Sequence, residues 1–226
     1  MVVDMIDTVI FDLDGTLLDT LEDLADSVNA ALEQFQLPAR TIGEIRNFVG
    51  NGVARLIERV VPDGKENPFY EKILCAFKEH YGQHCKDKTK PYDGVMDMLD
   101  DLCEKGYKLA IVSNKFDTAV KELSGLYFGR RILASIGESE SVRKKPAPDT
   151  VYQALKELSA DAGTVIYVGD SEVDIETAAN AGIPCISVTW GFRSEECLLA
   201  AGADKERMIT APSQLLPLLL SLSQVS

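Results

Sequence analysis

The chain has 226 residues, 46% of them hydrophobic, and a formal net charge of -13. This length suffices for one large domain or for a domain with an insertion, and the hydrophobic share suffices for a sizeable core. The excess of acidic residues argues against nucleic acid and anionic membranes as general partners, because both would repel the protein. An anionic substrate would need local positive charge or a metal ion in order to bind.

The N-terminal part of the chain predicts one strand followed by helices. Residues 8–11 form a short apolar run that is typical of a buried strand. Hydrophobic residues then recur at helical spacing over residues 21–35, and Pro38 ends this amphipathic helix. Three more helices are predicted over 41–49, 53–61 and 68–85, separated by breaks that contain glycine or proline. No strand is predicted between residues 17 and 90.

Strands and helices alternate after Pro91. Helices are predicted over 93–104, 117–123, 149–158 and 174–181, and strands over 108–112, 132–136, 164–168 and 184–188. Short apolar strands joined by helices indicate a parallel sheet that is covered on both faces. The predicted fold is therefore α/β, with a Rossmann-like core made of residues 1–16 and 90–226. An all-helical domain of residues 17–89 interrupts this core.

The end of the chain and the cysteines indicate a cytoplasmic protein. Residues 215–222 are apolar but too short to span a bilayer, so we expect a terminal helix, broken or kinked near Pro217. The five cysteines are widely spaced and form no Cys-x-x-Cys motif, which favours reduced thiols over disulfides or a zinc site. No basic and apolar leader precedes the first strand, so no export signal is expected.

Two aspartates follow the first predicted strand, in the run Phe11-Asp12-Leu13-Asp14-Gly15. Side chains two residues apart on a strand point the same way, and Gly15 lets the chain turn away. Two like charges at one strand end repel each other unless a cation or a shared proton offsets them. The pair of carboxylates therefore predicts a metal site with carboxylate chemistry.

Further polar residues follow the other predicted strands, where ligands of open α/β sheets bind. They are Ser113, Asn114 and Lys115 after one strand, Asp170, Ser171 and Asp174 after another, and Lys145 in a basic segment between them. Each residue alone also fits a simpler role as a turn residue, a helix cap or a solvated lysine. Their concentration at one edge of the sheet favours phosphoryl transfer, which needs a nucleophile, a cation and hydrogen-bond donors.

Four segments resemble, in order, the motifs of the haloacid dehalogenase superfamily. They are Asp12-x-Asp14-Gly15-Thr16, Ser113-Asn114, Lys145-Pro146-x-Pro148 and Gly169-Asp170-Ser171-x-x-Asp174. The resemblance covers essentially the whole chain, and it identifies the helical insertion as similar to the cap of that superfamily. A narrower similarity to phosphoglycolate phosphatases rests on residues 48–52 with Arg55, on 188–193 and on 200–204.

This resemblance implies a role for each core residue. Asp12 would attack phosphorus to give an aspartyl-phosphate, and Asp14 would move protons to the leaving alkoxide and from water. Mg²⁺ would be held by Asp12, Asp170 and the backbone carbonyl of Asp14, and by Asp174 either directly or through water. The phosphoryl oxygens would be bound by Ser113, the backbone of Asn114, and Lys145, which also screens Asp12. Thr16 would set the Asp14 side chain or the exit of the chain into the cap, and it is also counted among the residues that would bind the phosphate.

The substrate would be chosen by the cap. Gly50, Asn51 and Gly52 could bring backbone N–H groups, together with the Arg55 side chain, toward the non-phosphate end of a small acid. The equal alternative is a helix-breaking turn with Arg55 on a solvated face.

The sequence thus predicts a cytoplasmic, Mg²⁺-dependent phosphatase acting on a small phosphorylated metabolite, with 2-phosphoglycolate as the leading substrate. Pyrophosphatase, sugar-phosphate phosphatase and nucleotide phosphatase activities are alternatives within the hydrolases. A β-phosphoglucomutase-type isomerase and a catalytically silent binding module are alternatives outside them. Asp14 disfavours a dehalogenase, which needs no proton donor for an alkoxide. The choice between a monomer and a homodimer is left open.

Overall fold

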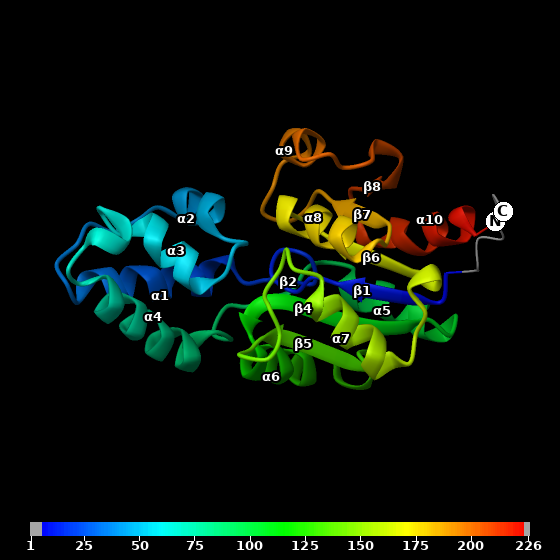
Figure 1. Cartoon of the computed structure of the whole chain (residues 1–226), viewed down its shortest axis with the longest axis horizontal. Helices are drawn as coiled ribbons and strands as arrows, with labels where there is room; N and C mark the ends of the chain where they lie inside the picture. The colour runs from blue at the N-terminus through cyan, green and yellow to red at the C-terminus, as the bar shows by residue number, and fades with distance from the viewer. Residues whose placement is uncertain (1–5, 224–226) are drawn as a thin grey trace.

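Six parallel strands form the central sheet of the computed structural model, which describes residues 6–223 (Figure 1). The strand order is β5-β4-β1-β6-β7-β8. The strands are β1 (Thr8–Phe11), β4 (Lys108–Phe116), β5 (Ala134–Glu138), β6 (Val165–Gly169), β7 (Cys185–Val188) and β8 (Met208–Ile209). The predicted parallel sheet is confirmed. Strand order runs outward from β1 in both directions, so the carboxyl end of β1 lies at the point where ligands bind in such sheets.

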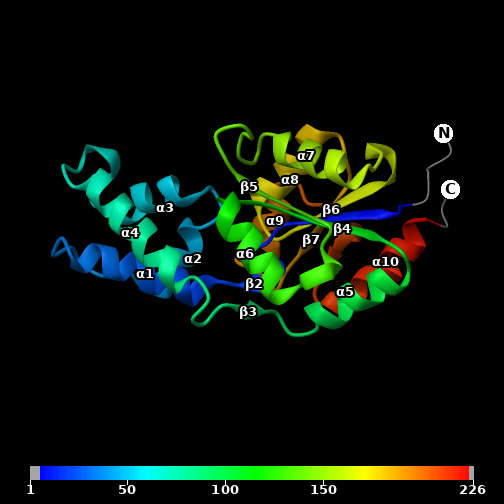
Figure 2. The same ribbon diagram turned by 90° about the horizontal axis from the view of Figure 1, so that it is seen from below.

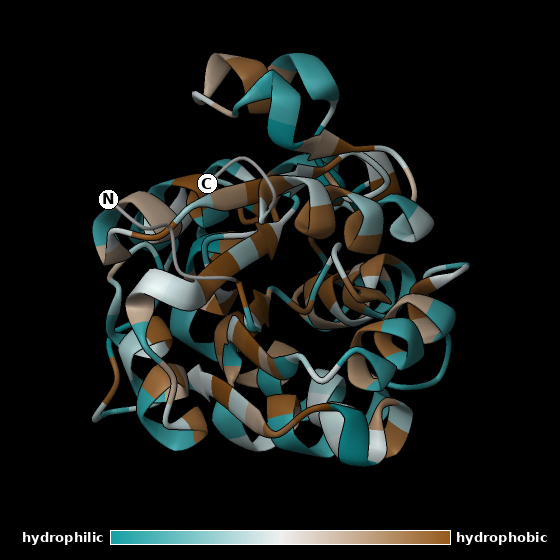
Figure 3. Ribbon diagram, turned by 90° about the vertical axis from the view of Figure 1, so that its right-hand side faces the viewer, coloured by the Kyte–Doolittle hydropathy of each residue, from teal (hydrophilic) through white to brown (hydrophobic). Residues whose placement is uncertain are grey.

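Helices cover both faces of this sheet (Figures 1 and 2). Along β1, Val9 and Phe11 belong to one hydrophobic cluster and Ile10 to the other, because alternate side chains point to opposite faces. The first face packs against α5 (Val95–Glu104), α6 (Asp117–Tyr127) and α10 (Leu215–Leu222), and the second against α7 (Asp149–Leu158) and α8 (Glu172–Ala181). Figure 3 shows hydrophobic strands enclosed between helices. Burial on both faces explains why the strands read as apolar runs.

Four helices lie apart from the sheet and form the insertion between β1 and β4 (Figure 1). They are α1 (Leu21–Glu33), α2 (Ile42–Phe48), α3 (Val53–Val60) and α4 (Tyr70–His84). The chain enters and leaves the insertion through a two-stranded antiparallel ribbon of β2 (Leu18–Asp19) and β3 (Lys90–Pro91). The prediction that no strand lies between residues 17 and 90 is wrong for β2. Two residues are too few for a periodic signal, and pairing with β3 is what makes β2 a strand.

Three further differences from the predicted elements have local causes. β4 continues to Phe116, so Ser113 lies inside the strand rather than after it. Helix α9 (Glu195–Ala200) and strand β8 were not predicted, because both are short. Pro217 lies in the first turn of α10, where the missing N–H removes no intrahelical hydrogen bond. The predicted break near Pro217 is therefore wrong, and the helix runs on to Leu222.

The cysteines and the helices show two simple features. All five cysteines are free thiols. Within residues 6–223, no helix has both the length and the apolar character that crossing a bilayer requires.

The return from the insertion to the core is held by a buried carboxylate on α1. Asp23 accepts hydrogen bonds from the backbone N–H of Lys88 at 3.0 and 3.1 Å and from that of Thr89 at 2.8 Å. Asp23 is almost completely buried. The side chain thereby joins the first helix of the insertion to the segment that leads into β3.

We predict that Asp23→Ala lowers the free energy of unfolding by about 1–3 kcal/mol, because two backbone donors lose their acceptor. Asp26→Ala is the matched control, since Asp26 is exposed and only pairs with the Lys88 ammonium at 2.7 Å. Its effect should stay below about 1 kcal/mol. Urea denaturation of the three proteins measures both values, and equal effects would contradict the assigned role of Asp23.

Candidate active site

A pocket opens at the carboxyl ends of β1, β4 and β6, between the sheet and the insertion. Its core side is lined by Asp12, Asp14, Ser113, Asn114, Lys115, Lys145, Asp170, Ser171, Phe192 and Arg193, and its insertion side by Leu24, Val49, Gly50, Gly52, Val53, Leu56 and Tyr81. The polar residues that the sequence predicts at the strand ends are thus brought together, while most of the insertion side is apolar.

Lys145 forms the centre of the charged network in this pocket. Its ammonium donates to Asp12 Oδ1 at 2.6 Å, to Asp174 Oδ1 at 2.7 Å and to the Tyr167 hydroxyl at 3.0 Å. The side chain is only 3% exposed, so Lys145 is not a solvated loop lysine. Burial alone would lower the pKa of Lys145, but the two carboxylates raise it above its ordinary value. Lys145 is therefore a fixed positive charge beside Asp12.

Asp12 directly follows β1 and has one carboxylate oxygen available to the pocket. Its N–H donates to the carbonyl of Val168 at 2.9 Å, which fixes the backbone against β6. Oδ1 accepts from Lys145, and no described residue donates a hydrogen bond to Oδ2. Burial raises the pKa of Asp12 well above its ordinary value. Lys145 opposes this shift, and the other carboxylates of the site add to it. Oδ2 is thus open to a cation or to an electrophile.

Asp170 directly follows β6, and two hydrogen bonds hold its carboxylate. The Thr16 hydroxyl donates to Oδ1 at 3.1 Å, and the Phe192 N–H donates to Oδ2 at 2.7 Å. Burial, together with the charge of Asp174, raises the pKa of Asp170 to about 7. Gly15 and Gly191 press against this carboxylate so closely that a Cβ at either position would collide with it. Thr16 itself is buried, and its hydroxyl binds Asp170 rather than Asp14, although a contact with Asp14 is one of the roles expected from the sequence.

Asp174 has all its acceptor positions occupied. Oδ1 accepts from Lys145 and from the Tyr167 hydroxyl, and Oδ2 accepts from the Ser171 N–H at 3.1 Å and the Ser171 hydroxyl at 2.6 Å. The bonds to Ser171 form the capping box at the start of α8. Asp174 is fully buried and does not line the pocket. Its geometry suits the positioning of Lys145.

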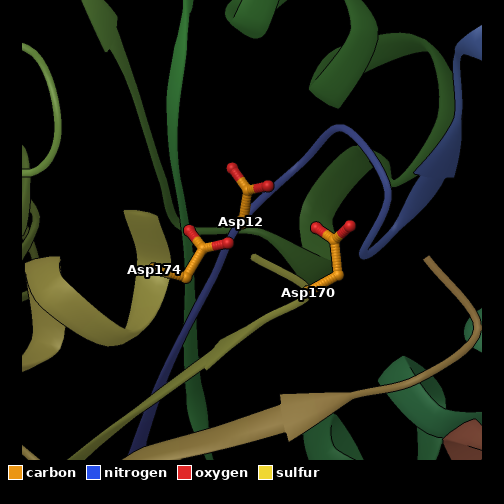
Figure 4. Close-up of side chains that lie close together, drawn as sticks. All are labelled: Asp12, Asp170 and Asp174. Atoms are coloured by element: carbon orange, nitrogen blue, oxygen red, sulfur yellow. The ribbon is translucent and has the colours of Figure 1, made fainter. Parts of the chain in front are cut away.

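Three carboxylates are close enough to hold one cation. Oxygen atoms of Asp12, Asp170 and Asp174 all lie within 4.8 Å of one another (Figure 4). Oxygen ligands of this kind suit a hard divalent cation such as Mg²⁺. Burial raises the pKa values of Asp12 and Asp170, and the neighbouring carboxylates add to both shifts. These two face the pocket, so the donor set fits a cation bound chiefly by Asp12 and Asp170.

A second buried ion pair joins the core to the insertion. The Lys115 ammonium lies 2.9 Å from Asp14 Oδ1 and donates to the Tyr81 hydroxyl of α4 at 2.6 Å. The Ser113 hydroxyl donates to Asp14 Oδ2 at 3.4 Å. Burial would lower the pKa of Lys115, but Asp14 and Tyr81 raise it above its ordinary value. The sequence motifs assign no role to Lys115. A strand extended to Phe116 would have placed Lys115 on the same face as Ser113.

Asn114 acts through its side chain, which connects three segments. Oδ1 accepts from the Lys145 N–H at 2.7 Å, and Nδ2 donates to the Lys145 carbonyl at 3.0 Å. Nδ2 also donates to the carbonyl of Gly50 in the insertion at 3.2 Å. The sequence predicted a role for the Asn114 backbone; the structure adds that the side chain holds the backbone of the lysine loop.

Of the insertion residues that the sequence predicts at the site, some line the pocket and others do not. Gly50 and Gly52 line the pocket, whereas Asn51 accepts a hydrogen bond from Arg59 at 3.3 Å and Arg55 pairs with Glu58 at 2.6 Å. The Arg55 side chain is half exposed and lies outside the pocket lining. The structure therefore brings the glycines to the site and leaves Arg55 at the surface.

Arg193 joins the core to the insertion next to Gly50 and Gly52, and the sequence motifs assign no role to it. Its guanidinium donates to both carboxylate oxygens of Glu172, at 2.7 and 3.1 Å. It also donates to the carbonyl of Val49 at 2.7 Å and to that of Arg46 at 3.1 Å. These bonds cross from the segment after β7 to the insertion and hold this part of the insertion over the pocket.

Comparison with known proteins agrees with this architecture. The family model of haloacid dehalogenase-like hydrolases matches residues 9–188. The phosphoglycolate phosphatase of Mesorhizobium japonicum is 34% identical over 188 residues, covering 81% of this chain and 83% of that protein. That of Aquifex aeolicus is 33% identical over 190 residues, covering 81% and 85%. The structure of a protein from Lactobacillus delbrueckii subsp. bulgaricus, proposed to be a phosphoglycolate phosphatase, has a TM-score of 0.88 and 35% identity, covering 92% of this chain and 96% of that one. The chain belongs to the haloacid dehalogenase-like hydrolases.

Proposed function

We propose that this protein is a Mg²⁺-dependent phosphatase that hydrolyses 2-phosphoglycolate, or a phosphorylated metabolite of similar size, through an aspartyl-phosphate on Asp12. The arrangement of Asp12 against the buried Lys145 carries the proposal. It leaves one carboxylate oxygen open toward the pocket while a fixed cation stands beside it. Phosphoglycolate phosphatases among the relatives support the choice of substrate.

Asp12 serves as the nucleophile in this mechanism. Its Oδ2 attacks phosphorus, and the bond from phosphorus to the alkoxide oxygen breaks. Lys145 reduces the repulsion between the carboxylate and the anionic phosphate. The Ser113 hydroxyl, which lines the pocket, donates to a phosphoryl oxygen. Water then hydrolyses the aspartyl-phosphate and restores Asp12.

Asp14 moves the protons. Its carboxylate lines the pocket two residues after Asp12, so it can protonate the departing alkoxide and later accept a proton from water. The carboxylates of Asp12 and Asp170, with the backbone carbonyl of Asp14, would hold Mg²⁺, and Asp174 would contribute through Lys145 or a water molecule. Bound Mg²⁺ supplies positive charge to the phosphoryl oxygens.

Phosphate release from a panel of phosphate compounds tests the proposal. The panel contains 2-phosphoglycolate, pyrophosphate, glucose 1-phosphate and a nucleoside 5′-monophosphate, each with and without Mg²⁺. We expect release from 2-phosphoglycolate above the others, and only with Mg²⁺. Absence of turnover, or conversion of glucose 1-phosphate to the 6-phosphate without phosphate release, would contradict the proposal.

We predict that Asp12→Asn reduces phosphate release by roughly 10³-fold or more, because the amide is a poor nucleophile. The melting temperature of the metal-free protein should not fall, since a buried charge is removed. Asp26→Asn makes the same change on an exposed helix face, and it should leave turnover within about twofold of wild type. Initial rates and thermal melts provide the measurements. Retained turnover in Asp12→Asn would exclude Asp12 as the nucleophile.

Lys145→Met should reduce phosphate release by roughly 10²–10³-fold, because a fixed charge beside the phosphate is lost. Its free energy of unfolding should also fall by about 3–5 kcal/mol, since Asp12 and Asp174 remain buried without their cation. Lys121→Met, on an exposed face of α6, should cost less than about 1 kcal/mol. Chemical denaturation measures these differences. Wild-type stability in Lys145→Met would contradict the buried network.

The stability of the metal-free protein should fall as the pH rises from 5 to 8. Asp170, whose pKa is raised to about 7, binds its proton more tightly in the folded than in the unfolded chain. Its contribution is complete below the ordinary pKa of about 3.9 and is lost as the pH passes through about 7. The pKa of Asp12 is raised as well, so Asp12 contributes in the same direction. Mg²⁺ should restore stability at pH 8 and have little effect at pH 5. Melting curves with EDTA or Mg²⁺ test this, and a metal-free protein that gains stability toward pH 8 would refute it.

A further inference from the structure

The cationic side chains that line the pocket differ in how many of their N–H groups already have a hydrogen-bond partner. Lys145 donates its three N–H groups to three partners, and Arg193 is bound by Glu172 and by two carbonyls of the insertion. Lys115 is almost as buried as Lys145 but has only Asp14 and Tyr81 as partners within residues 6–223. One N–H of the Lys115 ammonium is therefore left for a ligand in the pocket.

The position of Lys115 limits what that ligand can be. Its ammonium lies 2.9 Å from the carboxylate of Asp14, which protonates the leaving oxygen in the mechanism above. A group bound by Lys115 must therefore lie close to the leaving oxygen. In a phosphate ester, this position belongs to a substituent on the carbon that carries the bridging oxygen. An acceptor with negative charge gives the strongest hydrogen bond to an ammonium group.

The opposite wall of the pocket offers little else to a substrate. Leu24, Val49, Val53 and Leu56 are apolar, and Arg55 lies at the surface, paired with Glu58. The side chains of this wall offer no donors or acceptors for the hydroxyl groups of a sugar or for a nucleobase, and Gly50 and Gly52 add backbone groups only. It suits a short molecule that carries its polar groups toward the core.

We propose that Lys115 and Tyr81 form the specificity-determining subsite of this pocket, in which they bind the carboxylate of a short 2-phosphorylated hydroxy acid. The proposal rests on the phosphatase function proposed above and assigns the residues that select its substrate. Lys115 donates to the carboxylate, and the Tyr81 hydroxyl fixes the ammonium from the insertion side. The subsite is complete only when α4 packs over β4, because Tyr81 comes from the insertion.

Three esters that share a CH2–O–phosphate unit and carry tails of different charge test this subsite. They are 2-phosphoglycolate with a carboxylate, 2-hydroxyethyl phosphate with a neutral hydroxyl, and O-phosphoethanolamine with an ammonium group. For the wild-type protein with Mg²⁺, we expect kcat/KM to fall in that order. If none of the three is hydrolysed, the proposed function fails. If all three are hydrolysed equally well, the subsite fails while the phosphatase stands.

Lys115→Met should lower the ratio of kcat/KM for 2-phosphoglycolate to that for 2-hydroxyethyl phosphate by about tenfold or more. Loss of Lys115 also disturbs Asp14, and this disturbance slows the hydrolysis of all esters alike. The effect cancels in the ratio of kcat/KM values, which is therefore the quantity to measure. A parallel loss with an unchanged ratio would show that Lys115 acts only through Asp14, and it would overturn the proposal. Lys121→Met removes an exposed lysine and should leave the ratio unchanged.

Two further variants complete the test. Tyr81→Phe keeps the ring, which stacks on Phe77 at 5.4 Å, and removes only the hydroxyl. Tyr81→Phe should lower the ratio by about threefold. If Lys115→Met does not fold, Tyr81→Phe provides the test in its place. An unchanged ratio in Tyr81→Phe would contradict the subsite. A lowered ratio in Arg55→Met, with none in Lys115→Met, would place the carboxylate at the insertion arginine and overturn the proposal.

Discussion

The buried ammonium of Lys145 is the interaction on which the site depends. Asp12, Asp170 and Asp174 converge at one edge of the sheet, and their mutual repulsion would oppose folding without a compensating charge. Lys145 offsets two of them directly. The surrounding structure supports this contact, since the Asn114 side chain accepts from the backbone N–H of Lys145 and donates to its carbonyl. A cation held so firmly favours negative charge beside it, whether from a carboxylate or from a phosphate.

The parallel sheet explains why so much of the site could be predicted from the sequence. Apolar runs revealed the buried strands, and parallel strands bring their carboxyl ends to one edge. Asp12, Ser113 and Asp170 therefore lie on the same edge, and the pairing of β1 with both β4 and β6 brings them together. The resemblance to a known family then gave each residue a role. Very short elements such as β2 could not be found, because tertiary pairing alone makes them strands.

Directions of side chains were harder to predict than the positions of residues. Lys145 lies in the loop after β5, several residues beyond the end of the strand at Glu138, so its spacing does not show that the ammonium turns inward to Asp12. Thr16 reaches Asp170, more than 150 residues away, instead of the neighbouring Asp14. Arg55 could have been assigned from helical period, because Leu56 and Val60 form the buried face of α3 and Arg55 lies away from it.

The contacts of Asn114 have a consequence for how the pocket divides. Its amide holds the lysine loop through two hydrogen bonds within the core and reaches Gly50 through only one. A displacement of the insertion would break the bond to Gly50 and leave the other two intact. The contacts around Lys145 would stay assembled, while Tyr81 would separate from Lys115. Substitutions in the insertion can therefore alter the surroundings of Lys115 without disturbing the contacts that hold Lys145 beside Asp12.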